Sequence, residues 1–360
     1  MLQLCRIHRA VHHVRKDADV AVYEIIVVDD GSKDDSLSII LEQSKQDSRI
    51  KVFDLIINCK SFFARYWGIK NATGNYIMFL DGDDYFERDA CEVAYSMIEQ
   101  KKADVLEFKA TIHDGDSSKE FCNIVQGRLV GNDILERLSR NSIGQMLWNK
   151  IYRANLVKDV YESIPPVNLY YLEDVYFTTL IYARSSIYYG LRKPLYHYFK
   201  TTGQSRKFKR TSFEDFREQM KMGAVWNYLF VELTKMKIED EVFQRSVHAI
   251  LWNKMQLYIK RSLTLTLRYY GNDRFDDAVG EYKHYWFRIG NYGESAERYR
   301  RFAEKCLNDA LGLVNEIAGG DYPFDHRKIT EQQLVDYDPV VFECVYSGCV
   351  KTTCRSSIGW

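Results

Sequence analysis

The sequence lacks three features that would indicate common classes of protein. No apolar run approaches the roughly 20 residues that a membrane-spanning helix needs, and Met1–His13 lacks the continuous apolar core of a signal peptide. Lys plus Arg number 50 and Asp plus Glu number 50, so the net charge does not suggest a nucleic-acid partner. The eight cysteines form no C-x-x-C pair, which argues against a zinc module and favours a reduced, cytoplasmic compartment.

Two acidic clusters, each directly after a short apolar run, are the most informative feature present. Tyr23–Val28 runs into Asp29-Asp30-Gly31-Ser32, and Tyr76–Leu80 runs into Asp81-Gly82-Asp83-Asp84. Each run predicts a buried strand of a parallel sheet. Ligands of open α/β sheets bind beyond the carboxyl ends of the strands, so we expect one carboxylate-rich site. A divalent cation with oxygen ligands would offset that charge and admit a phosphorylated ligand.

Each acidic cluster alone is also typical of an ordinary turn, in which Asp caps and Gly supplies positive φ. An EF-hand is excluded for Asp81–Asp84, because the twelve-residue ligand spacing does not follow. The functional interpretation gains weight from the motifs that come later in the chain. These are Ala64–Gly68 (ARYWG), Trp148–Tyr152 (WNKIY), Glu173-Asp174 and the pair Leu195–Phe199 with Thr202–Ser205.

In this order, the motifs resemble an inverting family 2 glycosyltransferase of the bacterial surface-polysaccharide type, over about residues 20 to 205. The resemblance implies a GT-A fold, which is a Rossmann-like mixed α/β sheet flanked by helices. It implies a metal ion, Mn²⁺ or Mg²⁺, held by Asp81 and Asp83 of the D-x-D motif against the donor diphosphate. It assigns nucleotide and donor binding to Asp29, Asp30, Ser32, Arg65 and Asp81.

The later motifs supply the expected acceptor side. By position, the resemblance makes Asp174 the general base, and the charge of Glu173 beside it should raise the pKa of Asp174 toward neutrality. Glu173, Trp148 and Lys150 are expected on the acceptor side, although Trp148 alone fits a core residue equally well. His197 is either a ligand that completes the metal shell or a packed strand histidine, and the second is favoured.

The start of the chain departs from the family pattern. Residues 1–22 contain no I-I-P-x-Y-N strand, and their apolar spacing predicts a helix, so the first strand is either missing or upstream of Met1. His8 and His12 share a helical face, for which a metal site is far less expected than an exposed polar face. In the A-R-N-x-G pattern, Tyr66 replaces the second Asn, and Lys60 stands where the family has Gly.

We therefore expect a GT-A domain over residues 1–209, a helical C-terminal region over 210–329 and a poorly ordered tail over 330–360. The expected function is metal-dependent transfer of a hexosyl or N-acetylhexosaminyl unit from a nucleotide sugar to a hydroxyl of a glycan or lipid-linked acceptor. The resemblance places this reaction in the cytoplasm, with peripheral association at the inner face of the membrane. Two alternatives remain: a non-catalytic nucleotide-sugar or glycan-binding protein, and a nucleotidyltransferase, although the Gly-rich phosphate loop that the latter needs is not visible.

Overall fold

The computed structural model describes residues 24–56, 58, 60–164, 169, 172–200, 213, 223–236, 239–270, 277, 301–309 and 312. Several expectations fall outside these residues. They are the N-terminal helix, the missing first strand, the pair His8 and His12, the Thr202–Ser205 motif and the tail 330–360.

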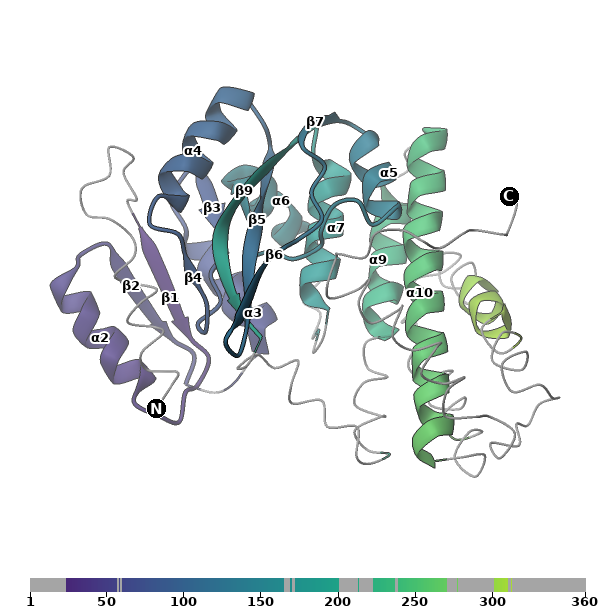
Figure 1. Ribbon diagram of the computed structural model, residues 1–360, viewed down its shortest axis with the longest axis horizontal. Coiled ribbons are helices and arrows are strands. Elements are labelled where there is room, and N and C mark those ends of the chain that lie inside the picture. Colours follow the sequence, from purple (N-terminus) through teal and green to yellow (C-terminus); the bar gives the residue numbers. More distant parts are fainter. Residues whose placement is uncertain are drawn as a thin grey trace.

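A mixed seven-stranded sheet forms the centre of the molecule, with helices on both of its faces (Figure 1). Its strand order is β3-β8-β5-β9-β4, with β6 paired to β5 and β7 paired to β9. Strands β5 and β9 run parallel, whereas the other pairings in this sheet are antiparallel. The strands are β3 (Tyr76–Met78), β4 (Tyr85–Phe86), β5 (Val105–Asp114), β6 (Ser117–Phe121), β7 (Gly127–Val130), β8 (Lys150–Arg153) and β9 (Ile187–Phe199).

The first acidic cluster belongs to a separate pair of strands. Strand β1 (Ile25–Asp29) pairs in parallel with β2 (Ile50–Asp54), and helix α2 (Ser36–Gln46) connects them. This pair lies at one end of the molecule in Figure 1. The expectation of parallel pairing is confirmed for β1 but wrong for β3, whose partner β8 is antiparallel. Only Asp29 of β1 is buried, and the other four residues of this strand are half-buried.

Alternating side chains of the central sheet build two hydrophobic cores. On β5, Leu106 packs with helix α4 (Ala90–Lys101), whereas Val105 joins the core on the other face. That second core includes helices α5 (Asp133–Ser139), α6 (Ala154–Ser163) and α7 (Glu173–Arg184). This two-sided covering is the reason that the first four residues of β5 are all buried, on whichever face their side chains lie.

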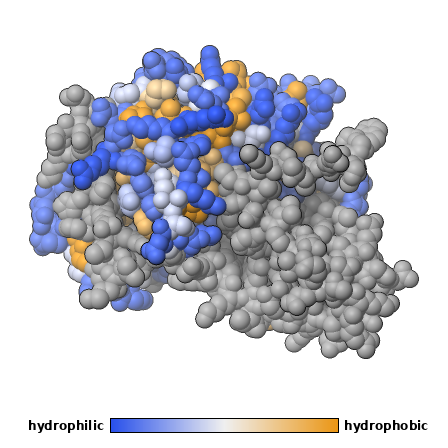
Figure 2. Space-filling view, viewed as in Figure 1, coloured by the Kyte–Doolittle hydropathy of each residue, from blue (hydrophilic) through white to orange (hydrophobic). Residues whose placement is uncertain are grey.

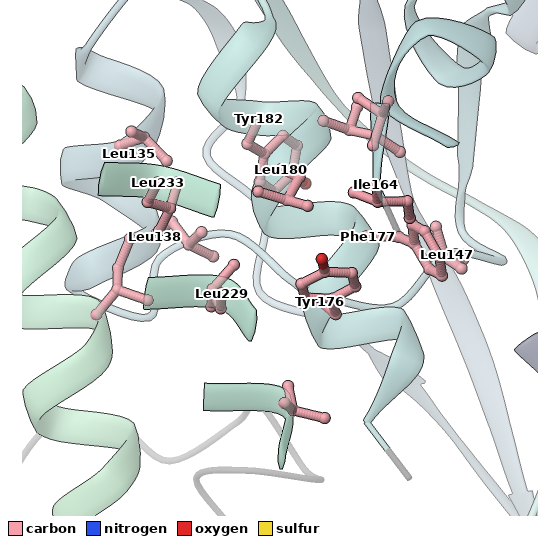
Figure 3. Close-up of a cluster of buried hydrophobic side chains, with 14 of the residues drawn as sticks. Leu135, Leu138, Leu147, Ile164, Tyr176, Phe177, Leu180, Tyr182, Leu229 and Leu233 are labelled. Atoms are coloured by element: carbon pink, nitrogen blue, oxygen red, sulfur yellow. The ribbon is translucent and has the colours of Figure 1, made fainter. Parts of the chain in front are cut away.

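The expected helical C-terminal region is confirmed by α9 (Gly223–Lys235), α10 (Glu241–Tyr270) and the helical residues 301–309. Leu229 and Leu233 of α9 lie with side chains of α5 and α7 in the close-up of this core (Figure 3). Helix α10 packs on α5, so the region continues the core of the sheet. A boundary at residue 209 stays a prediction.

The surface of the described part is largely hydrophilic on the face shown in Figure 2, with hydrophobic residues visible between polar ones. None of the helices that the structure describes has the length and apolar character needed to cross a membrane. Cys91, Cys122 and Cys306 form no disulfide bond among the described residues.

Candidate functional site

The first acidic turn is closed by Asp29. Its carboxylate is buried and accepts hydrogen bonds from the backbone N–H of Ser32 at 2.9 Å and from the Ser32 hydroxyl at 2.5 Å. Both oxygens of Asp29 are thus engaged within the turn, whereas Asp30 beside it is half-buried. Asp29 therefore fixes the shape of the turn, and Asp30 and Ser32 form its more accessible surface.

The second acidic turn is anchored by Asp84, a residue to which the sequence analysis gave no role. Asp84 N–H donates to the carbonyl oxygen of Asp81 at 3.0 Å, and the Asp84 carboxylate accepts from the Tyr196 hydroxyl at 2.7 Å and from Phe199 N–H at 2.8 Å. Burial, with the charges of Asp81 and Asp83, raises the pKa of Asp84 to about 8. Hydrogen bonds between Asp84 and β9 therefore hold the turn in place, and Asp81 and Asp83 remain partly exposed.

Arg65 joins this second turn to the start of helix α7. Its guanidinium lies 2.9 Å from Oδ1 of Asp81 and 2.5 Å from Oε1 of Glu173. The Ser61 hydroxyl donates to the same Glu173 oxygen at 2.6 Å. Burial opposes the charge of Arg65, but Asp81 and Glu173 outweigh it and hold the pKa of Arg65 well above its usual range. The sequence predicted a cation at this position, and the structure pairs it with carboxylates from two motifs.

Helix α3 (Lys60–Asn71), which carries Arg65, also packs on β1. A methyl group built on Gly68 would lie 3.9 Å from Cγ2 of Val28, the residue before Asp29. At the other end of these strands, Thr73 N–H donates to Glu24 at 2.8 Å, just before β3 and β1 begin. The two strands thus start together. Helix α3 contacts β1 near its carboxyl end and, through Arg65, the turn that follows β3. This arrangement supports one site for both acidic turns.

Asp174 lies in the first turn of α7. The residue just before this helix, Leu172, has a left-handed backbone with φ of 58°, a conformation that costs a non-glycine residue roughly 1–2 kcal/mol. Asp174 is half-buried, and its Oδ1 accepts from Val175 N–H at 2.8 Å. Burial and the charge of Glu173 raise its pKa to about 7, against the opposing effect of Arg65. A carboxyl group in this state can exchange a proton near neutral pH.

Trp148, predicted either as core or as an acceptor-side aromatic, is 7% exposed. Its ring stacks on Tyr196 at 4.4 Å between centroids and on Tyr198 at 5.5 Å. Because Tyr196 also donates a hydrogen bond to Asp84, Trp148 supports the second acidic turn indirectly, through its stacking on Tyr196.

Lys150, also predicted on the acceptor side, lies in the core. Its ammonium is 3.0 Å from Oε1 of Glu107, and both side chains are completely buried. Glu107 also accepts hydrogen bonds from Asn149, Tyr182 and Tyr188. Lys150 therefore neutralises a buried carboxylate and presents no surface to an acceptor.

His197 occupies a polar chain on the sheet surface. One ring nitrogen lies 2.7 Å from Oε1 of Glu87, the other lies 2.9 Å from Nε2 of His113, and the ring stacks on Tyr85 at 4.3 Å. This geometry fits the packed strand histidine that the sequence favoured. Within the residues that the structure describes, no group of three or more His, Cys, Asp and Glu side chains is arranged to hold a metal ion.

Sequence reasoning missed Ser61, Asp84 and Tyr196. Ser61 could have been found, because it precedes Arg65 by four residues and so shares its helical face. The contacts of Asp84 and Tyr196 could not, because they join residues 112 positions apart.

Comparison with known proteins identifies similar sequences and a similar fold. Residues 4–144 match the family model described as Glycosyl transferase family 2. The chain is 29% identical over 216 residues to the poly(ribitol-phosphate) beta-N-acetylglucosaminyltransferase TarS of Staphylococcus aureus, covering 59% of this chain and 36% of the relative. It is 30% identical over 191 residues to the putative glycosyltransferase EpsH of Bacillus subtilis, covering 49% of this chain and 52% of that one.

The structure resembles that of residues 1–349 of S. aureus TarS solved in complex with UDP-GlcNAc, with a TM-score of 0.65 at 21% identity. This match covers 90% of this chain and 91% of the other. It shows that the fold is shared.

Residues 4–144 are therefore similar to glycosyl transferase family 2, and the chain shares the GT-A fold of TarS. The expected resemblance to family 2 and the expected fold class are confirmed, and the similar proteins named above are glycosyltransferases. The chain spans only about a quarter to a half of the length of the curated relatives that it matches.

Proposed function

We propose that this protein is a metal-dependent, inverting glycosyltransferase that moves a hexosyl or N-acetylhexosaminyl unit from a nucleotide sugar to an acceptor hydroxyl. The observation that carries the proposal is the Arg65 bridge between Asp81 and Glu173, because it joins the donor-side turn to the helix start that bears Asp174. A nucleotide donor of the UDP-GlcNAc type is supported by the similarity to TarS, whose structure was solved with that compound.

The metal proposal depends on Asp81 and Asp83. Their carboxylate oxygens fit a hard cation such as Mg²⁺ or Mn²⁺, and the Asp81 side chain is 35% exposed. Since the described residues offer no larger ligand group, oxygens of the donor diphosphate would complete the shell, as is usual for Mg²⁺. When bound, the cation would neutralise charge that builds on the leaving diphosphate.

The chain's own residues supply the remaining steps. The Asp29–Ser32 turn offers backbone and side-chain polar groups to the nucleotide. Asp174 accepts the proton that the acceptor hydroxyl loses as it attacks, a role suited to a pKa of about 7. Attack from the face opposite the leaving group inverts the anomeric carbon.

We infer the setting from the named relatives. TarS acts on a poly(ribitol-phosphate), which supports a surface glycan or lipid-linked acceptor for this chain. As the family resemblance implies, we propose a cytoplasmic location for the enzyme, with peripheral association at the inner face of the membrane.

The test is the release of UDP from UDP-GlcNAc with Mn²⁺, in the presence of poly(ribitol-phosphate) or lipid-linked glycans. We expect Asp174→Asn to lower turnover by about 10²- to 10⁴-fold, because the base is lost. Asp133→Asn, an exposed Asp in the first turn of helix α5, is the matched control and should retain activity. Nearly full turnover in Asp174→Asn would refute the assignment. Retained UDP binding without UDP release in the wild type would favour the non-catalytic alternative.

A further inference from the structure

The side chain of Glu173 is the most firmly held carboxylate at the start of α7. Its Oε1 atom accepts from Ser61 and from Arg65, two residues one helical turn apart on α3. The Glu173 side chain is 12% exposed and that of Arg65 is 16% exposed, so water screens the pair weakly. Because Glu173 precedes Asp174 directly, a fixed Glu173 also fixes the backbone that carries Asp174.

We infer that Arg65 and Glu173 are positioning residues that hold Asp174 in the charge environment of a base and connect it to the donor-side turn through Asp81. Only the naming of Asp174 as the base rests on the proposed function. The electrostatic connection itself rests on the contacts among α3, α7 and the turn after β3.

The groups that face Asp174 come from four elements. Glu173 of α7 and Asp81 after β3 contribute negative charge, and Arg65 of α3 contributes positive charge. Tyr161 of α6 also faces this cluster, and its hydroxyl has no hydrogen-bond partner in the described part of the chain. Burial raises the pKa of Tyr161 far above its usual value, so Tyr161 stays neutral. Arg65 is therefore the one cation among the four groups.

This arrangement predicts the direction in which each substitution shifts the ionisation of Asp174. Glu173→Gln removes a like charge and frees Arg65 from its partner, and both effects favour ionised Asp174. Arg65→Met removes the cation and leaves the charge of Glu173 uncompensated, and both effects favour protonated Asp174. Ser61→Ala removes a neutral partner of the same oxygen, so it tests packing without a change of charge.

The experiment follows the Asp174 carboxyl directly by ¹³C NMR in protein labelled at the aspartate carboxyl carbon, with Asp174→Asn identifying its signal. The wild type should titrate at about 7. We expect the midpoint to fall by about one pH unit in Glu173→Gln and to rise by about one unit in Arg65→Met. Ser61→Ala and Arg65→Lys, which keep the charges, should shift it much less.

Midpoints that stay unchanged, or that move in the same direction in both charge variants, would overturn the inference. If Arg65→Met fails to fold by circular dichroism, the opposite shifts of Glu173→Gln and Arg65→Gln decide the question instead. The pH profile of UDP release from UDP-GlcNAc separates the two proposals. Opposite NMR shifts without any UDP release would keep the inference and refute the transferase, whereas UDP release with an unmoved acidic limb would show that Asp174 is not the base.

Discussion

The hydroxyl of Tyr196 lies between two residues of the second acidic turn. It donates to Oδ2 of Asp84 at 2.7 Å and accepts from Asp81 N–H at 3.3 Å. A single, completely buried side chain from β9 therefore holds both ends of the Asp81–Asp84 turn. This contact explains why a Tyr in the Leu195–Phe199 motif matters to a cluster more than a hundred residues earlier.

We predict that Tyr196→Phe destabilises the protein by about 1–3 kcal/mol, the usual cost of leaving a buried polar group, here the Asp84 carboxyl, without its hydrogen-bond partner. Because the turn is held less firmly, UDP should also bind more weakly in the presence of Mn²⁺. Chemical denaturation and calorimetric titration measure the two effects. Tyr189→Phe, seven residues earlier on the same strand, is the control and should change neither by as much.

A second prediction concerns Lys60, which replaces a family glycine at the start of α3. Its φ is 72°, in the left-handed region that glycine adopts without strain. Lys60→Gly should therefore stabilise the protein or leave it unchanged, with a gain of up to about 1 kcal/mol. The same substitution at Lys70, in the last turn of that helix, should cost about 1 kcal/mol. Equal losses at the two positions in thermal unfolding would contradict this account.

The buried pair Glu107 and Lys150 gives a third prediction. Lys150→Met leaves an uncompensated carboxylate in the core and should cost about 3–5 kcal/mol of unfolding free energy. Combining it with Glu107→Gln should recover much of that loss, because the buried charge is then absent. A double variant no more stable than Lys150→Met would argue against charge compensation. Denaturant titrations of the three variants measure this coupling.

The polar chain of His113, His197 and Glu87 predicts a dependence of stability on pH. Burial, and the neighbouring His197, lower the pKa of His113 below its usual value of 6.5. The unfolded chain therefore binds a proton more readily than the folded protein, and stability should fall as the pH drops below about 6.5. On acidification, the melting temperature of His113→Gln should fall less than that of the wild type. Lys119→Gln, on the exposed strand β6, should behave like the wild type.

Much of the fold could be predicted from hydrophobic pattern and turn signals. The runs before Asp29 and Asp81 form strands, and helix α7 begins at Glu173 as the motif suggested. The antiparallel pairing of β3 could not be predicted, because a short apolar run carries no information on the direction of its partner.

The site was predicted in its residue types more than in its contacts. Arg65 was expected as a cation near a diphosphate, and its pairing with both Asp81 and Glu173 depends on how α3 is placed between two distant segments. The prediction for Lys150 was wrong for the same reason: the sequence motif does not reveal whether its lysine is buried or exposed. The side chain of Lys150 is completely buried beside Glu107 because the packed sheet encloses both residues.

The central claim is that the turns at Asp29–Ser32 and Asp81–Asp84 form one site for a nucleotide diphosphate and a cation. Calorimetric titration of UDP with and without Mn²⁺ tests it most directly. We predict that Mn²⁺ tightens UDP binding at least about tenfold, or about 1.4 kcal/mol, and that Asp30→Asn weakens binding while Asp81→Asn abolishes the metal effect. A UDP affinity that does not change with Mn²⁺, or that is unchanged in both variants, would contradict the claim.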